Sequence, residues 1–136
     1  MEARIQRGLG SLSRLKRIAS LSWEEFSTDR DILDIAERNM HILLEVILDL
    51  ASFIVARREL ARATTYKEVM RTLISEGIIP KNYSRLAIAM PGLRNILVHM
   101  YADINYKILY DIIVNELNEV EKILNILINE VEKIDP

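Results

Sequence analysis

The sequence predicts an all-α protein, folded as an up-and-down bundle of four to five helices. Over most of its 136 residues, apolar side chains recur every three or four positions, which is the spacing of one helix face. No stretch alternates apolar and polar residues with the period of two that a half-buried strand requires. The chain has four glycines and three prolines, and no internal repeat or low-complexity segment interrupts the pattern. We therefore expect one helical domain that spans residues 1–136.

The first predicted helix spans residues 2–20. Its apolar residues recur at helical spacing, although Gly8 and Gly10 weaken the pattern because glycine favours the unfolded chain. A short helical turn follows in the stretch "SWEE", where Ser22 stands three residues before Glu25. This spacing is typical of a capping box, in which each residue satisfies a backbone N–H of the other.

The longest predicted helix spans residues 29–58 and carries a continuous apolar stripe. We expect Thr28 to cap its N-terminus, because a threonine oxygen can accept from the free N–H groups of a first turn. Asp31 in the first turn and Arg57 in the last turn have the charges that the helix dipole favours.

Three further elements complete the predicted bundle. After a loop of sequence "ELARATT", Thr65 is expected to cap a helix that Gly77 ends. A fourth helical segment spans residues 83–102, and one last helix spans residues 105–133.

Composition narrows the class of protein. The chain has no cysteine, which excludes a disulfide framework and a thiolate metal site. We see no signal peptide and no apolar run long enough to cross a bilayer, so we expect a soluble cytoplasmic protein without membrane contact. Residues 57–94 hold eight basic and three acidic side chains, whereas residues 103–136 hold three basic and eight acidic ones. The basic centre is either a local patch for a polyanion or a set of ordinary solvated helix faces.

The stretch "RNILVHMY", which begins at Arg94, places polar side chains in an otherwise apolar helix. Asn95 and His99 are four positions apart and share one face, while Arg94 and Tyr101 share the neighbouring face. Arg94 and His99 lie about 140° apart around the axis and about 7.5 Å apart along it, so they do not stack within one helix. Pro91, just before the stretch, is expected either to kink the helix or to restart it.

Arg94 and His99 form a minimal set for cleaving RNA without a metal. Histidine titrates near neutral pH and can move a proton, while the planar fork of arginine matches phosphate oxygens. Asn95 could orient the imidazole. The chain offers no clustered metal ligands and no paired acids beside the stretch, so we expect neither a metal nor a cofactor. On spacing alone, a surface cation and a structural histidine remain alternative interpretations.

The string "GLRNILVHMY" resembles the signature of the HEPN superfamily, and more closely that of its HepT-like toxin branch. That signature is an arginine, four residues, a histidine, one residue and a tyrosine, here Arg94, His99 and Tyr101, with Asn95 after the arginine. The flanking segments "DILDIAERNMHILLEVILDLASFIVA", "TYKEVMRTLISEGII" and "YADINYKILYDII" are also similar to the family, so the resemblance covers roughly residues 29–130.

The resemblance implies a HEPN-like homodimer in which the motifs of two chains face one cleft, with Arg94 and His99 as catalytic residues and Asn95 in support. It implies a metal-independent endoribonuclease toxin of a type VII-like toxin–antitoxin system, with RNA as substrate. Its partner would be a nucleotidyltransferase antitoxin of the MNT type, which silences the toxin by adding AMP to Tyr101.

A second interpretation stays open, that of a non-catalytic HEPN module that uses the same cleft to bind a nucleotide, RNA or only its partner. Two positions depart from the family pattern. Pro91 directly precedes the motif, and His41 lies in the long helix, where we interpret it as a half-buried structural residue.

Overall fold

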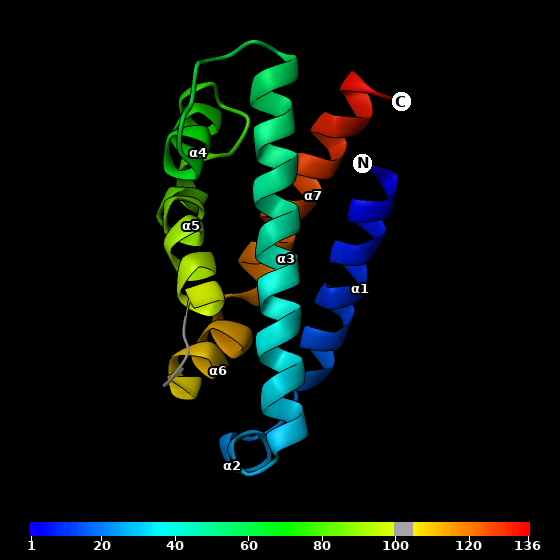
Figure 1. The fold of residues 1–136 in the computed structure, drawn as a ribbon, viewed down its shortest axis with the longest axis vertical. Helices are drawn as coiled ribbons and strands as arrows, with labels where there is room; N and C mark the ends of the chain where they lie inside the picture. Colours follow the sequence, from blue (N-terminus) through cyan, green and yellow to red (C-terminus); the bar gives the residue numbers. More distant parts are fainter. Residues whose placement is uncertain (100–104) are drawn as a thin grey trace.

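Helix α3 (Arg30–Arg57) runs through the centre of a helical bundle (Figure 1). The computed structural model describes residues 1–99 and 105–136, without the side chains of Val98 and His99. The described residues form seven α-helices and one short 3-10 helix, and they contain no strand. Besides α3, the elements are α1 (Glu2–Ile18), α2 (Trp23–Ser27), α4 (Tyr66–Ser75), η1 (Lys81–Tyr83), α5 (Ser84–His99), α6 (Tyr106–Asn115) and α7 (Leu117–Ile134).

The elements alternate in direction, which confirms the predicted up-and-down bundle (Figure 1). The chain descends through α1, ascends through α3, descends again through α4 and α5, and ascends through α7. Helix α3 contacts every other α-helix of the bundle and has 28 residues, which confirms that the long apolar stripe forms the longest element. Both termini lie at the end of the bundle where α3 finishes.

Local capping signals explain most helix ends. The Glu25 N–H donates to the Ser22 hydroxyl and the Ser22 N–H donates to the Glu25 carboxylate, so the predicted capping box is confirmed. The Thr65 oxygen accepts from the N–H of the third residue of α4, as expected. Gly77 follows α4 with a φ of 76°, a left-handed conformation that strains any residue with a Cβ.

The predicted N-cap of the long helix was wrong by one residue. Asp29, and not Thr28, caps α3, and its carboxylate accepts from the N–H groups of Asp31 and Ile32. The Thr28 hydroxyl instead donates to the carbonyl of Glu24, at the end of α2. With only two residues between α2 and α3, each side chain serves a different helix.

Two predicted boundaries in the second half also differ from the structure. Helix α5 continues through Pro91, which excludes the restart, one of the two expected effects of this residue. Pro91 is buried, and the packing of α5 against α3 and α4 stabilises the helix despite the missing N–H. The single last helix was also wrong, because the chain breaks at Glu116 between α6 and α7. The Glu116 carboxylate lies 3.0 Å from the Arg85 guanidinium, a contact with α5 that no local pattern reveals.

Helix α3 is long and apolar enough, by length and composition alone, to cross a membrane. Most of that stretch is buried among the other helices, as is usual for the central helix of a bundle. Its burial inside the core accounts for its apolar character without a bilayer.

Helix α1 approaches α3 closely at Gly8. A Cβ at this position would lie 2.9 Å from Cγ1 of Val46, a stiff side chain on α3, whereas a Cβ at Gly10 would meet only the flexible end of Arg14 at 3.4 Å. We expect Gly8→Ala to lower the free energy of unfolding by about 1 kcal/mol, because overpacking outweighs the gain in helix propensity. Gly10→Ala, the matched control, should raise it by up to about 1 kcal/mol. Urea denaturation measures both, and equal stabilisation by the two changes would contradict the close approach at Gly8.

Candidate functional site

The motif residues lie in the last turns of α5. Buried Leu86, Ala87 and Met90 attach the first half of this helix to the core, and α5 packs against both α3 and α4. The rigid first half therefore determines the position of the second half, which carries Arg94 and Asn95. His99 is the last residue of α5, but its side chain lies outside the described part, and Tyr101 lies outside the described residues altogether.

The Arg94 side chain is held between three helices. Its Nη1 donates to Oε1 of Glu45 on α3 at 3.1 Å, and its guanidinium lies 5.0 Å from the centre of the Tyr66 ring on α4. The side chain is only 20% exposed. Its Nε is buried and has no hydrogen-bond partner among the described residues. Arg94 is therefore a cation held in a defined position, and its planar guanidinium matches the oxygens of a phosphate.

A histidine lies on the other side of the same carboxylate. His41, one turn before Glu45 on α3, places its Nε2 3.5 Å from the Glu45 oxygen that also binds Arg94. His41 is half-buried, as the sequence predicts, and Nε2 makes no hydrogen bond to a described residue. Glu45 therefore stands between two side chains that can carry positive charge, and it links α3 to the motif.

Asp49, one turn beyond Glu45, extends this polar row along α3 and lies 3.4 Å from Arg4 of α1. Burial raises the pKa of the Asp49 carboxyl, the neighbouring Arg4 guanidinium opposes the shift, and the Glu45 charge adds to it. The Asp49 carboxyl is therefore easier to neutralise than that of an exposed aspartate.

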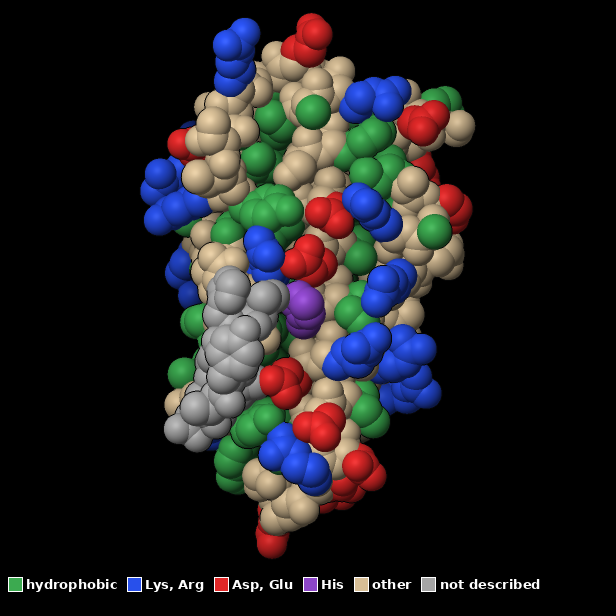
Figure 2. Space-filling model, in the orientation of Figure 1, with side chains coloured by type: hydrophobic (Ala, Val, Ile, Leu, Met, Phe, Trp, Pro, Cys, Tyr) green, Lys and Arg blue, Asp and Glu red, His purple; other side chains and the backbone are tan. Residues whose placement is uncertain are grey.

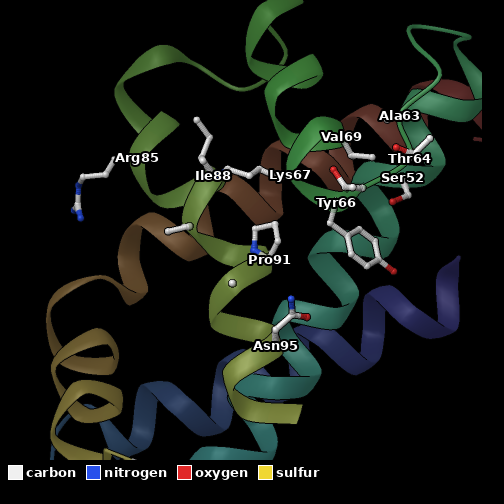
Figure 3. Close-up of a pocket in the computed structure, with 13 residues that line it drawn as sticks. Ser52, Ala63, Thr64, Tyr66, Lys67, Val69, Arg85, Ile88, Pro91 and Asn95 are labelled. Carbon is white, nitrogen blue, oxygen red and sulfur yellow. The ribbon is translucent and has the colours of Figure 1, made fainter. Parts of the chain in front are cut away.

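Asn95 faces a different space from Glu45. It lines a hollow of about 770 Å³ between α4, α5 and the end of α3, with Pro91 and Tyr66 on the walls and Lys67 at the rim (Figure 3). Tyr66 thus separates this hollow from Arg94, which lies against its ring. The predicted role of Asn95 in orienting His99 stays a prediction, because the imidazole lies outside the described part.

Sequence reasoning missed the two residues that hold Arg94. The sequence pattern indicates no functional role for Tyr66, and it does not distinguish Glu45 from the other charged residues of the long helix. One signal was present for Glu45, because it is a carboxylate between Leu44 and Val46, both buried in the central helix. Such a position usually needs a charged partner. Within the described ranges, no three His, Asp or Glu side chains are grouped closely enough to hold a metal ion.

We expect Glu45 and Arg94 to stabilise the fold jointly. A double-mutant cycle with Glu45→Ala and Arg94→Ala should give a coupling free energy of about 1 kcal/mol in urea denaturation, since both side chains are partly buried and the pair is less screened than on an open surface. Arg30 and Asp34 form the control pair at 3.1 Å, because both are 62% exposed and their coupling should be at most about 0.5 kcal/mol. Equal coupling in the two cycles would contradict a special role for the Glu45 contact.

Comparison with known proteins identifies similar chains. The sequence model of the family described as Ribonuclease HepT-like matches residues 9–127. The mRNA nuclease HepT of Shewanella oneidensis (strain ATCC 700550) is 24% identical over 115 residues, which cover 83% of this chain and 86% of that protein.

Solved structures share the fold. A tri-AMPylated Shewanella oneidensis HEPN toxin in complex with an MNT antitoxin superposes with a TM-score of 0.81 at 21% identity, over 93% of this chain and 95% of that one. The cytosolic protein of unknown function YutE from Bacillus subtilis superposes with a TM-score of 0.76 at 17% identity, over 97% and 91% of the two chains. These matches confirm the HEPN-like helical architecture.

Proposed function

Because this chain belongs to the HepT-like ribonuclease family, we propose that it is a metal-independent endoribonuclease and the toxin of a toxin–antitoxin pair. The observation that carries the proposal is the position of Arg94. Its guanidinium is held by Glu45 and Tyr66, and Arg94 stands five positions before His99, with the four intervening residues of the motif. The Shewanella relatives, an mRNA nuclease and a HEPN toxin bound to an MNT antitoxin, support the same function.

The proposed reaction uses the ribose as nucleophile. His99 takes the proton of the 2′-OH, the 2′ oxygen attacks phosphorus, the bond from phosphorus to the 5′ oxygen breaks, and the departing oxygen takes up a proton. Arg94 stabilises the negative charge that builds on the phosphoryl oxygens, and Asn95 orients the imidazole. The products are a 2′,3′-cyclic phosphate and a 5′-hydroxyl, because no water enters this step.

We propose that two chains complete the site. Arg94 and His99 project about 140° apart from one helix, so motifs from two chains that meet at a two-fold axis would supply complementary groups. Ile96, on the turn between them, is 52% exposed, and Ile108 on α6 is 54% exposed, which suits an apolar interface beside the motif. A monomer in light scattering at micromolar concentration would contradict this arrangement.

The proposed partner is an MNT-type nucleotidyltransferase antitoxin that adds AMP to Tyr101, and the proposed location is the cytoplasm. The Shewanella toxin is AMPylated in its complex with such an antitoxin, and the Bacillus protein of the same fold is cytosolic.

The test is an RNA cleavage assay with the purified chain and its His99→Ala variant, with and without EDTA. We expect the wild type to cleave RNA in EDTA and to leave 2′,3′-cyclic phosphate ends, and we expect His99→Ala to be inactive. Cleavage that stops in EDTA would contradict a metal-independent reaction. RNA binding without any cleavage would favour the alternative, a non-catalytic HEPN module that binds RNA, a nucleotide or its partner through the same cleft.

A further inference from the structure

A groove with a volume of about 410 Å³ lies between α1 and α3, next to the carboxylate that binds Arg94. The polar side chains that line it are Arg4 and Arg7 of α1 and Arg38, His41, Glu45 and Asp49 of α3. Figure 2 shows this face of the molecule, with basic side chains gathered over α1 and acidic ones along α3. The groove is therefore lined by cations and hydrogen-bond acceptors, together with the apolar side chains of Ile42 and Val46.

The close contact of α1 with α3 gives this groove a fixed width. Gly8, one residue after Arg7, brings the two helices so near that a Cβ would lie 2.9 Å from the Val46 side chain. The backbone of α1 that carries Arg4 and Arg7 is consequently held close to the polar row of α3. A groove built on two packed helices is preorganised, which reduces the entropy lost when a ligand binds.

Two of the three arginines are available for an anion. Arg4 forms an ion pair with Asp49 at 3.4 Å, whereas Arg7 and Arg38 form no ion pair with a described residue. The planar fork of arginine binds phosphate oxygens through two parallel hydrogen bonds. The carboxylates of Glu45 and Asp49 accept hydrogen bonds and repel anions, so a bound phosphate would lie beside Arg7 and Arg38 and away from these two carboxylates. A ligand that matches this row carries both anions and donors, as RNA does with its phosphates and 2′-hydroxyls.

The groove reaches the carboxylate of Glu45, which binds Arg94 on its other side. Tyr66 separates the larger hollow from Arg94. The two cations that line this hollow are Lys67 and Arg85, and Arg85 is already paired with Glu116 at 3.0 Å. Most of its remaining lining is neutral. The groove between α1 and α3 is thus the better path for a chain of phosphates.

We propose that this groove binds the phosphates of the single-stranded RNA that flanks the cleaved bond, with Arg7 and Arg38 each contacting one phosphate. The proposal rests on the proposed ribonuclease function, and it adds a substrate-binding surface that lies outside the motif and reaches into α1. The RNA leaves Arg94, passes His41 and continues between the two helices, while Glu45 and Asp49 accept from ribose hydroxyls.

The test is fluorescence anisotropy with a labelled ten-nucleotide single-stranded RNA and the His99→Ala variant, to which Arg7→Ala and Arg38→Ala are added singly and together. Each added change should weaken binding about threefold to tenfold and reduce the slope of log affinity against log salt by about 0.7, the value for one phosphate contact on a single strand. Lys122→Ala, which removes one exposed cation from α7, is the control and should change neither quantity.

Unchanged affinity and salt slope in the variant that lacks both arginines would overturn the proposal. So would a loss confined to Lys67→Ala, because the RNA would then lie in the larger hollow. If the proposed function fails and the groove proposal holds, the results differ. The wild type would cleave no RNA, and the variants that lack Arg7 or Arg38 would still bind RNA more weakly than the protein that retains both arginines. Circular dichroism of each variant checks that the helices remain folded.

Discussion

Arg94→Ala is expected to slow RNA cleavage about a hundredfold to a thousandfold. The reason is the loss of a preorganised cation at the phosphoryl oxygens, where charge increases during the reaction. Glu45 and Tyr66 hold the guanidinium before any substrate arrives, so the wild-type site needs little reorganisation. Arg94→Lys should cleave faster than Arg94→Ala but more slowly than the wild type. A lysine ammonium cannot form two parallel hydrogen bonds to a phosphate, and it does not stack on the Tyr66 ring as a planar guanidinium does.

Single-turnover cleavage of a labelled RNA measures this effect separately from product release. Arg85→Ala is the matched control, because Arg85 is an exposed arginine on the same helix and is paired with Glu116 outside the motif. Its rate should stay near that of the wild type. Arg94→Ala combined with His99→Ala should be little slower than the slower single variant, because both residues act on one step. Full activity of Arg94→Ala, with its fold intact, would remove Arg94 from the proposed mechanism.

Tyr101→Phe is expected to prevent silencing by the partner nucleotidyltransferase. After co-expression with that enzyme, intact-mass analysis should find increments the size of AMP on the wild type and none on Tyr101→Phe. An added phosphate near Arg94 would pair with the cation proposed to bind the substrate phosphate, so modification should abolish cleavage through both occupancy and charge.

Two other tyrosines have hydroxyls that are already engaged. The Tyr106 hydroxyl contacts Arg30 and Glu37, and the Tyr110 hydroxyl donates to the carbonyl of Leu21 at 2.6 Å. Tyr106→Phe is therefore the control and should be modified like the wild type. Equal mass increments on Tyr101→Phe and the wild type would show that AMP is added to a residue other than Tyr101. No increment on either, together with a tight inhibitory complex, would mean that the partner silences the chain by binding alone.

The sequence was sufficient to predict the fold class and most helix ends. The apolar spacing of α3 and the capping residues Ser22 and Thr65 act over three or four neighbouring residues, and the structure confirms each of them. Helix signals of this kind are local, because the backbone groups that they satisfy belong to the same turn. Where two local signals stood side by side, at Thr28 and Asp29, the sequence did not decide which residue caps α3.

The errors in the second half have a common cause. Apolar residues keep their helical spacing through Glu116, since Ile113, Leu117 and Val120 are all buried, and yet the helix breaks there. At Pro91 the local signal predicted a possible restart, and packing on α3 and α4 keeps α5 continuous. In both places, contacts between helices outweigh the preference of a single turn.

By itself, the sequence determined that the chain is a helical bundle and that Arg94, Asn95 and His99 follow one another on one helix at fixed angles, because helix geometry depends only on position along the chain. Only the tertiary structure decided what surrounds Arg94. Glu45 is 49 residues away and Tyr66 is on a third helix, and they reach the guanidinium because α3 and α4 pack on α5. The groove beside them likewise forms between α1 and α3, two helices that approach each other closely at Gly8. Side-chain packing sets these distances, and no periodicity in the chain encodes them.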